Sequence, residues 1–276
     1  MPDAAATERV PVGVDPTRAS IARVYDAFLL GKDNYEIDRQ VLQQVQKAAP
    51  EAQDLAFENR GFLIRVCRFL AGQTGITQFL DLGSGLPTAE NTHQVVQRIN
   101  PETKVVYIDN DPVVLAHGRA LLEENEHTHF VAEDIFEPQK ILENEIVRQH
   151  IDFSQPLVLL QMGTLHHYKG DHDRPAEIMK EYVDALPSGS FVGLSHFFDP
   201  ENDDSATARR MEDFFVHSPM GSGTFRTHKE IEALFPGLEM VPPGVVRCAD
   251  WWPDGPRLKE LNVAQRTIAG GVGRKP

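Results

Sequence analysis

The stretch from residue 76 to residue 88 constrains this chain most strongly, because an apolar run in it leads directly into a glycine-spaced loop. The run 76–80 is typical of a buried strand, and Asp81, Gly83 and Gly85 follow it. Glycine can adopt positive φ and has no Cβ, so the backbone of such a loop can come close to a ligand. Pro87 suits the first position of a helix, whose positive end would face the same ligand. The pattern predicts a ligand between a strand end and a helix start.

A second acid narrows the choice of ligand. Asp109 ends the apolar run 104–108, at the sequence spacing where a carboxylate commonly binds a ribose. A dinucleotide fits less well, because Thr88 stands where its fingerprint has a third glycine. Asp81 favours the same conclusion, since a carboxylate repels a pyrophosphate and attracts an ammonium or sulfonium group. This spacing of one acid and two glycines resembles the first motif of S-adenosylmethionine-dependent methyltransferases.

Composition excludes several classes of protein. The 276 residues, 41% of them hydrophobic, suffice for one sizeable domain with room for a second small one. A formal net charge of -14 argues against nucleic acid, which requires clustered Lys and Arg. No apolar run approaches the roughly 20 residues of a membrane span, and the start lacks a secretory signal. Cys67 and Cys248 are expected to be reduced thiols. We therefore expect a cytoplasmic protein with a small-molecule partner and neither a nucleic-acid nor a membrane partner, and the oligomeric state stays open.

The first part of the chain has helical patterns only. Residues 1–14 are expected to form a disordered tail, and residues 15–72 a helical cap or lid. Asp15 and Pro16 predict a helix start, as N-cap and first helical residue, and Gly31 predicts its end. Two further amphipathic helices follow, one across 37–45 that ends before Pro50 and one across 51–70.

Strands alternate with helices from residue 73 onward, which predicts a Rossmann-like α/β domain over 73–276. Strands are expected at 76–81, 104–109, 128–132, 156–162 and 190–196, and helices at about 88–99, 112–125, 138–149 and 174–186. This alternation favours right-handed crossovers and a doubly wound parallel sheet. Two late strands are expected at 238–246 and 267–273. Pro242 to Gly244 interrupts the first of them, as in an edge strand or a bulge.

Many short segments, in the same order along nearly the whole chain, resemble the actinobacterial family of predicted S-adenosylmethionine-dependent methyltransferases. The segments are Ala22 to Asp26, Leu30 to Tyr35 with Asp38 and Arg39, Glu58 to Arg60, Phe79 to Pro87, Tyr107 to Pro112, Leu165 with His166, Gly189 with Ser190, Ser195 with His196, Pro243 with Gly244, and Trp252 with Pro253. The resemblance implies a class I methyltransferase fold, with a seven-stranded sheet whose last strand is antiparallel, and S-adenosylmethionine as cofactor. It supplies no acceptor. After Asp134 the family continues with an arginine and an acid, whereas this chain has Ile135 to Glu137, so a contact through that arginine is absent here.

Each residue of the predicted cofactor site has a structural alternative. Asp109 would accept hydrogen bonds from both ribose hydroxyls, or it is a solvated acid at a strand end. Asp134 would accept from the adenine amino group beside an apolar Ile135, or it is a loop or helix-capping carboxylate. Asp81 would lie close to the methionine part of the cofactor and stabilise its positive charge, or it accepts hydrogen bonds from backbone N–H groups in the turn. Arg60 would hold the cofactor's carboxylate through two hydrogen bonds, or lie solvated on its helix.

The remaining predicted cofactor contacts lie on loops and strand ends. They are Gly31, Asn34 and Tyr35 in a turn that closes over the cofactor or merely connects two helices, Gly83, Ser84 and Gly85 in the glycine loop, and Asn110, Gln161 and Met162.

Methyl transfer needs little from a protein beyond alignment, so a general base is optional. His166 and His167 follow the fourth predicted strand, where a substrate would meet the sulfonium, and they are the candidate catalytic residues. The alternative is a pair of hydrogen-bonded structural histidines. Together with Asp171, His172 and Asp173 they also have the ligand types of a metal site. A polar loop explains the same residues, and we predict no metal.

Three functions remain open from the sequence. The first is a methyltransferase that acts on a small molecule by in-line methyl transfer from S-adenosylmethionine. The second is a non-catalytic protein that binds the same cofactor and has a regulatory role. The third is a nucleotide-dependent oxidoreductase with a modified glycine loop, which Thr88 and the late strands disfavour. Fold alone does not decide among them.

Overall fold

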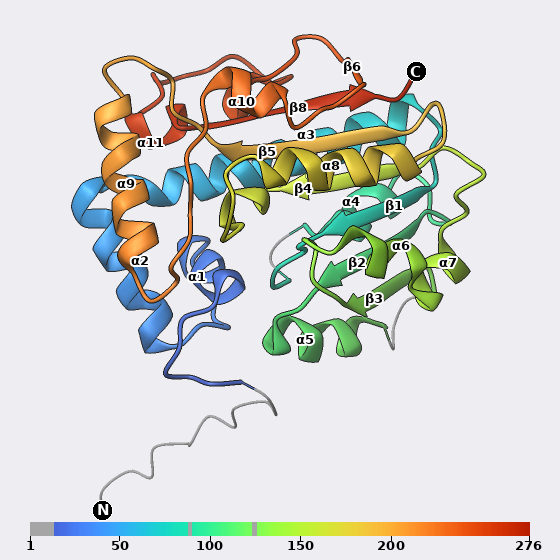
Figure 1. Cartoon of the computed structure of the whole chain (residues 1–276), viewed down its shortest axis with the longest axis horizontal. Helices are drawn as coiled ribbons and strands as arrows, with labels where there is room; N and C mark the ends of the chain where they lie inside the picture. Colours follow the sequence, from blue (N-terminus) through green and yellow to red (C-terminus); the bar gives the residue numbers. More distant parts are fainter. Residues whose placement is uncertain (1–13, 88–89, 123–125) are drawn as a thin grey trace, which may run out of the picture.

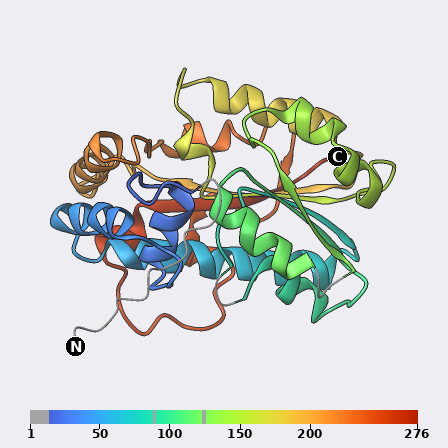
Figure 2. The same ribbon diagram turned by 90° about the horizontal axis from the view of Figure 1, so that it is seen from below.

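A computed structural model describes residues 14–87, 90–122 and 126–276. One sheet runs through the molecule, with helices on both of its faces (Figures 1 and 2). The predicted tail lies outside the described residues except for Val14, and so does Thr88. Across the described ranges, no helix combines the length and the apolar character needed to cross a membrane.

The sheet has the predicted doubly wound form. Its strands are β1 (Gln78–Leu82), β2 (Lys104–Asp109), β3 (Thr128–Ala132), β4 (Val158–Met162), β5 (Phe191–Phe197), β6 (Glu239–Met240), β7 (Val246–Arg247) and β8 (Ile268–Arg274). The order is β3-β2-β1-β4-β5-β8-β6, with β7 also paired to β8. Strands β1 to β5 are parallel, and β8 is antiparallel to β5. The predicted parallel sheet with an antiparallel last strand is confirmed.

The late strand expected at 238–246 was predicted too long. The structure has β6 and β7 there, each of two residues, and both pair with β8. Pro242 and Pro243 stand between them, and proline has no N–H to donate to a neighbouring strand. The seven predicted strands therefore correspond to eight observed ones.

Helices cover both faces of the sheet. They are α1 (Ile21–Phe28), α2 (Glu36–Ala48), α3 (Ala52–Gln73), α4 (Thr92–Gln97), α5 (Pro112–Leu122), α6 (Pro138–Glu143), α7 (Glu145–His150), α8 (Arg174–Ala185), α9 (Ser205–His217), α10 (His228–Glu232) and α11 (Val263–Arg266), with 3-10 turns η1 (Leu165–His167) and η2 (Cys248–Asp250). Successive side chains of a strand point to opposite faces. Accordingly Phe79 belongs to the cluster of buried residues that includes helices α1 to α4, whereas Leu80 belongs to the cluster that includes α6, α7 and α8.

Two helix starts were predicted too early. Asp15 accepts hydrogen bonds from the N–H and hydroxyl of Thr17 and forms a turn, and α1 begins only after Ser20, whose side chain accepts the N–H of Arg23 at 3.2 Å. The helix after the glycine loop likewise begins at Thr92, with Asn91 as its cap, and not at Pro87. Local polar side chains already satisfy the backbone at these places, so a proline alone does not start a helix.

Helix α3 lies close against the sheet because strand β8 has a glycine where the two meet. A Cβ on Gly270 would lie 2.7 Å from Cε1 of Phe62 on α3 and 2.7 Å from the carbonyl oxygen of Leu194 on β5. Phe62 is completely buried, and Trp251 meets its ring edge-on at 5.6 Å between centroids. The glycine therefore sets how near the helix comes to the strands.

Candidate functional site

A cavity of about 350 Å³ lies where the parallel strands β1 to β4 end. Its size is within the range of small-molecule sites, and its position is where open α/β sheets bind their ligands. Helix α1 forms its opposite wall, and Figure 1 shows that helix on the side toward which the arrows of β2, β3 and β4 point. The predicted site residues that line the cavity are Arg60, Asp81, Gly83, Ser84, Gly85, Asp109, Asn110, Asp134, Ile135, Met162 and His167.

Five predicted residues lie outside the cavity lining. They are Gly31, Asn34, Tyr35, Gln161 and His166. Gln161 is fully buried in β4, and its Oε1 accepts a hydrogen bond from the hydroxyl of Thr164. Its Nε2 has no partner among the described residues.

The backbone N–H groups of the glycine loop are bonded within the protein, although the three loop residues line the cavity. Those of Gly83 and Ser84 donate to the carbonyl of Ile108 at 2.8 and 3.2 Å, and that of Gly85 donates to Oδ2 of Asp109 at 2.9 Å. The glycines instead serve the backbone path, since Gly83 has φ 76° and Gly85 has φ 64°. The loop is thereby fastened to the end of β2.

Asp109 uses both carboxylate oxygens to hold the loops around it. Oδ2 accepts the N–H of Gly85, and Oδ1 accepts the N–H of Asp111 at 2.9 Å. Burial raises the pKa of Asp109 to about 6 despite these hydrogen bonds. Each oxygen can accept a further hydrogen bond, so the carboxylate can still bind a ligand hydroxyl.

Asp81 is a buried carboxylate at the end of β1. Its Oδ2 accepts the hydroxyl of Thr92 at 2.7 Å. Burial raises the pKa of Asp81 to about 6, and the Thr92 hydrogen bond and the Arg60 guanidinium oppose that shift. A cationic ligand beside this carboxylate would favour its ionised form.

Arg60 reaches the cavity from α3 and is only partly bonded. Its Nη2 donates to the carbonyl of Glu90 and to Oδ1 of Asn91, each at 3.1 Å. Its Nε is buried and has no partner in the part of the chain that the structure describes. A buried N–H without an acceptor is costly, so a ligand carboxylate at this edge would satisfy it.

Asp134 and Ile135 follow β3 and form the part of the cavity wall at the end of that strand. Oδ1 of Asp134 accepts the N–H of Phe136 at 2.9 Å, which is the loop role considered from the sequence. The carbonyl of Ile135 accepts the Tyr182 hydroxyl at 2.8 Å and is thereby held in place. The Ile135 side chain, where the family pattern has arginine, lines the cavity as an apolar surface.

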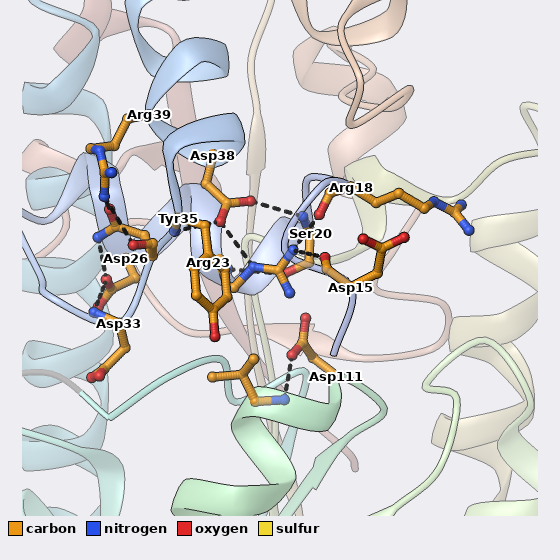
Figure 3. A network of polar contacts seen from close by, with 12 residues as sticks. Asp15, Arg18, Ser20, Arg23, Asp26, Asp33, Tyr35, Asp38, Arg39 and Asp111 are labelled. Atoms are coloured by element: carbon orange, nitrogen blue, oxygen red, sulfur yellow. Dashed lines mark hydrogen bonds and ion pairs between the residues drawn. The ribbon is translucent and has the colours of Figure 1, made fainter. Parts of the chain in front are cut away.

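The turn from Gly31 to Tyr35 is held by two buried acids (Figure 3). Asp26 Oδ2 accepts the N–H of Asp33 at 3.0 Å and the side-chain amide of Asn34 at 2.7 Å. A Cβ on Gly31 would lie 1.9 Å from Oδ1 of Asp26, which explains why glycine stands there. These contacts place the turn beside α1 and outside the lining of the cavity.

The second acid, Asp38, joins the turn to α1. It receives the Nε of Arg23 at 2.9 Å, the N–H of Ser20 at 3.1 Å and the N–H of Tyr35 at 2.9 Å. The Arg23 guanidinium also lies over the Tyr35 ring, 5.2 Å from its centroid. Ser20 lines the cavity, so this ion pair positions part of its wall.

The two candidate histidines occupy different environments. The His166 ring stacks on Phe197 with centroids 3.5 Å apart, and its Nδ1 accepts the N–H of Phe197 at 3.3 Å. His167 lines the cavity, with Nδ1 3.1 Å from the hydroxyl of Ser222. Burial lowers the pKa of His167 to about 3, and the ammonium of Lys169 adds to the shift.

The neighbouring polar loop has its own contacts. Nε2 of His172 lies 2.9 Å from Oε1 of Glu230 and 3.0 Å from Nη1 of Arg226. Among the described residues, no group of three or more His, Cys, Asp or Glu side chains is arranged to hold a metal ion.

Several cavity residues were not predicted. Among them are Tyr25, Asn59, Thr164, Lys169 and Met220. Tyr25 and Asn59 lie in segments that carried the family resemblance, which was a usable signal. Asn59 donates to the Tyr25 hydroxyl at 3.1 Å and accepts from Ser195 at 2.5 Å, and it therefore connects α1, α3 and β5. Lys169 lies in the loop after η1 and Met220 in the loop after α9, and no local sequence pattern marks either residue as part of a site.

Comparison with known proteins agrees with this geometry. Residues 7–276 match the model of a family described as S-adenosyl methyltransferase. The chain is similar to a candidate methyltransferase from Thermobifida fusca YX, with 42% identity over 96% of this chain and 97% of that one and a TM-score of 0.90. A DUF574 family protein from Streptomyces avermitilis has 32% identity over 95% and 99% of the two chains and a TM-score of 0.88. No protein of curated function gives a significant match. The resemblance found in the sequence is confirmed: the chain belongs to the S-adenosyl methyltransferase family and is an S-adenosylmethionine-dependent methyltransferase.

Proposed function

We propose that the cavity at the ends of β1 to β4 holds S-adenosylmethionine and that the methyl acceptor is a small molecule. The observation that carries this proposal is the convergence of carboxylates from three neighbouring strand ends on one cavity. Asp81, Asp109 and Asp134 all line it, and the buried Nε of Arg60 lies without a partner among the described residues. The donor and acceptor set fits an adenosine joined to an amino acid.

Each of these residues has a proposed role. Asp109 binds the ribose hydroxyls, because its carboxylate oxygens, which accept the N–H groups of Gly85 and Asp111, can each accept a further hydrogen bond. Asp134 and Ile135 hold the adenine. Asp81 stabilises the positive charge of the methionine part of the cofactor, and Arg60 binds the carboxylate of that same part.

When bound, S-adenosylmethionine supplies an electrophilic methyl group, which a lone pair of the acceptor displaces in line from a sulfur that becomes a neutral thioether. The protein positions both partners, and the proton that a methylated hydroxyl or amine releases passes to solvent. His167 faces the acceptor. With a pKa of about 3 it is neutral and a weak base, so we propose that alignment contributes more than proton removal. A proton-accepting role would require Nδ1 to donate to Ser222, which leaves Nε2 to accept.

The charge of the cavity supports a small acceptor over nucleic acid. Asp81, Asp109, Asp111, Glu133 and Asp134 are its acidic lining residues, and the whole chain carries a formal net charge of -14. A phosphate backbone near these groups would be repelled. A small molecule that is neutral or positively charged has no such cost.

Calorimetry tests the cofactor assignment. We expect S-adenosylmethionine and its demethylated product, S-adenosylhomocysteine, to bind, and NAD not to bind. Asp109→Ala should weaken both by about 1.5–3 kcal/mol, because a charged acceptor is lost. Asp152→Ala is the matched control, since Asp152 accepts an N–H two residues ahead, as Asp109 does, but lies exposed outside the cavity. Unchanged affinity in a folded Asp109→Ala protein would remove the ribose assignment, and NAD binding at similar affinity would favour the oxidoreductase.

A further inference from the structure

A second, smaller cavity of about 40 Å³ lies behind the first, between α1, α3 and α9. Its walls are apolar and rich in aromatic rings. Phe28, Phe197 and Phe215 form one side, and Phe215 lies 5.2 Å from Phe197 and 6.2 Å from Phe28 between centroids. Ala52 and Met211 contribute from α3 and α9. We refer to this space as the side cavity.

The side cavity shares part of its wall with the cofactor cavity. Four residues line both: Ile21, Tyr25, His167 and Met220. A molecule in the side cavity therefore lies next to whatever occupies the larger one. Such proximity is what a two-substrate reaction requires, because donor and acceptor must meet in line.

The two cavities differ in charge. The larger one is lined by five carboxylates, and the side cavity has no Asp, Glu, Lys or Arg among its described lining residues. A charged group moved among these side chains would lose its hydration without gaining a partner. The side cavity is therefore suited to a neutral apolar group, and its rings favour another ring through edge and face contacts.

Polar groups are confined to the junction of the two cavities. The Tyr25 hydroxyl donates to the carbonyl of Ala56 at 3.2 Å and accepts from Asn59 at 3.1 Å, so it is held in place. Nδ1 of His167 is 3.1 Å from the Ser222 hydroxyl. A hydroxyl or amine on the ligand would meet Tyr25 and His167 where the cofactor cavity begins, while the rest of the ligand stays among apolar atoms.

We propose that the methyl acceptor is an aromatic alcohol or amine whose neutral ring enters the side cavity and whose nucleophilic oxygen or nitrogen faces the cofactor cavity at His167 and Tyr25. This inference rests on the proposed function and names the substrate class for that site. The ring selects the acceptor by burial, and the junction orients its nucleophile.

Ligand-observed NMR on the full chain saturated with S-adenosylhomocysteine tests the substrate class. Phenol, aniline and indole serve as ring probes, and glucose and glycine serve as polar probes. We expect the ring probes to bind and the polar probes not to bind. Ala52→Leu, which fills the side cavity from α3, should weaken ring-probe binding by at least about 10-fold, because one or more added methyl groups in an apolar pocket discriminate to that extent. S-adenosylhomocysteine affinity should be unchanged.

Two further variants keep the result decisive. Ala206→Leu makes the same change on the exposed side of α9 and should bind the ring probes as the wild type does. Phe28→Leu enlarges the side cavity and should favour indole over phenol, a shift that can be measured even if Ala52→Leu does not fold. Equal binding of polar and ring probes, or ring-probe binding that neither cavity variant alters, would overturn the proposal. Ring probes that bind in the side cavity of a protein unable to bind S-adenosylhomocysteine would support the side cavity and overturn the proposed function instead.

Discussion

Asp81 is a buried carboxylate whose ionisation should make ligand binding depend on pH. Its pKa is raised to about 6 by burial, against the opposing effects of Thr92 and Arg60. The same cause raises the pKa of Asp109 to about 6. An acid with a pKa of about 6 is mostly protonated below about pH 6 in the ligand-free protein and mostly ionised above that pH. A cationic ligand that needs the ionised form should bind better on the alkaline side of that value.

We therefore expect the affinity for S-adenosylmethionine to fall as the pH drops below about 6. Each carboxylate that must lose a proton contributes up to about 10-fold per pH unit. Calorimetry between pH 5 and pH 8 measures this slope. Asp81→Asn should bind more weakly at pH 8 and show a smaller slope, since one titrating group is gone. An identical slope in the wild type and the variant would mean that Asp81 does not titrate with binding.

His167 should remain neutral over the working range of pH. Burial lowers the pKa of this imidazole to about 3, so its charged form is disfavoured at pH 5 and above. NMR of histidine-labelled protein, with His167→Gln to identify the signal, should show no protonation between pH 8 and pH 5. A midpoint between pH 6 and pH 7 would contradict the expectation and restore His167 as an efficient general base.

Among the elements, α1 and α2 depend on one buried ion pair. Arg23 and Asp38 are almost completely buried, and Asp38 also receives the N–H groups of Ser20 and Tyr35 (Figure 3). Removing one member of such a pair leaves the other charge buried without its partner, which commonly costs about 3–5 kcal/mol. Segment 15–35 would then lose its attachment before the sheet does.

Asp38→Asn should make segment 15–35 more sensitive to proteolysis and should weaken S-adenosylmethionine binding, because Ser20 and Ala22 line the cavity. Bound cofactor should protect the same segment in the wild type if it closes over the ligand. Glu36→Gln is the control on the same helix, since the Glu36 pair with Arg39 is exposed and contributes little. Equal digestion rates with and without cofactor would rule out the predicted lid.

Element positions were predictable where the pattern depended on burial. The five parallel strands were found because their apolar runs are buried and several end in acids, and Asp81 and Asp109 do line one cavity. Helix starts were less predictable, because Asp15 bonds to Thr17 in a turn before α1 begins. The position of His166 depends on Phe197, which lies thirty-one residues later in the chain, stacks on the His166 ring and donates its N–H to His166 Nδ1. Contacts at that separation leave no local pattern.

At the scale of the whole molecule, the N-terminal helices share one hydrophobic core with the sheet. Val24 of α1 and Val45 of α2 belong to the same cluster of buried residues as Phe79 and Val105 of the sheet. The division at residue 72 between a cap and a Rossmann-like domain remains a prediction from sequence. Shared burial favours a single cooperative unfolding transition.

Val45→Ala should lower the free energy of unfolding by about 2 kcal/mol, from the two buried methyl groups and the space that they leave. In urea, tryptophan fluorescence and far-UV circular dichroism should shift together, since Trp251 packs against Phe62 of α3. Gln43→Ala, at an exposed position of α2, should change stability by less than about 0.5 kcal/mol. An earlier transition seen only by circular dichroism would show that the helices unfold as a separate unit.

Gly270 links the distance between α3 and the sheet to the shape of the cavity. Phe62 can sit against β8 only because Gly270 lacks a Cβ, and one helical turn before Phe62 the same α3 carries Asn59 and Arg60 into the cavity. A Cβ at position 270 would force the Phe62 ring or the β5 backbone at Leu194 to move, and a shift of α3 would carry Asn59 and Arg60 with it. No residue of β8 is among the described lining of the cavity, so a substitution at position 270 should change the shape of the cavity while every lining residue stays the same.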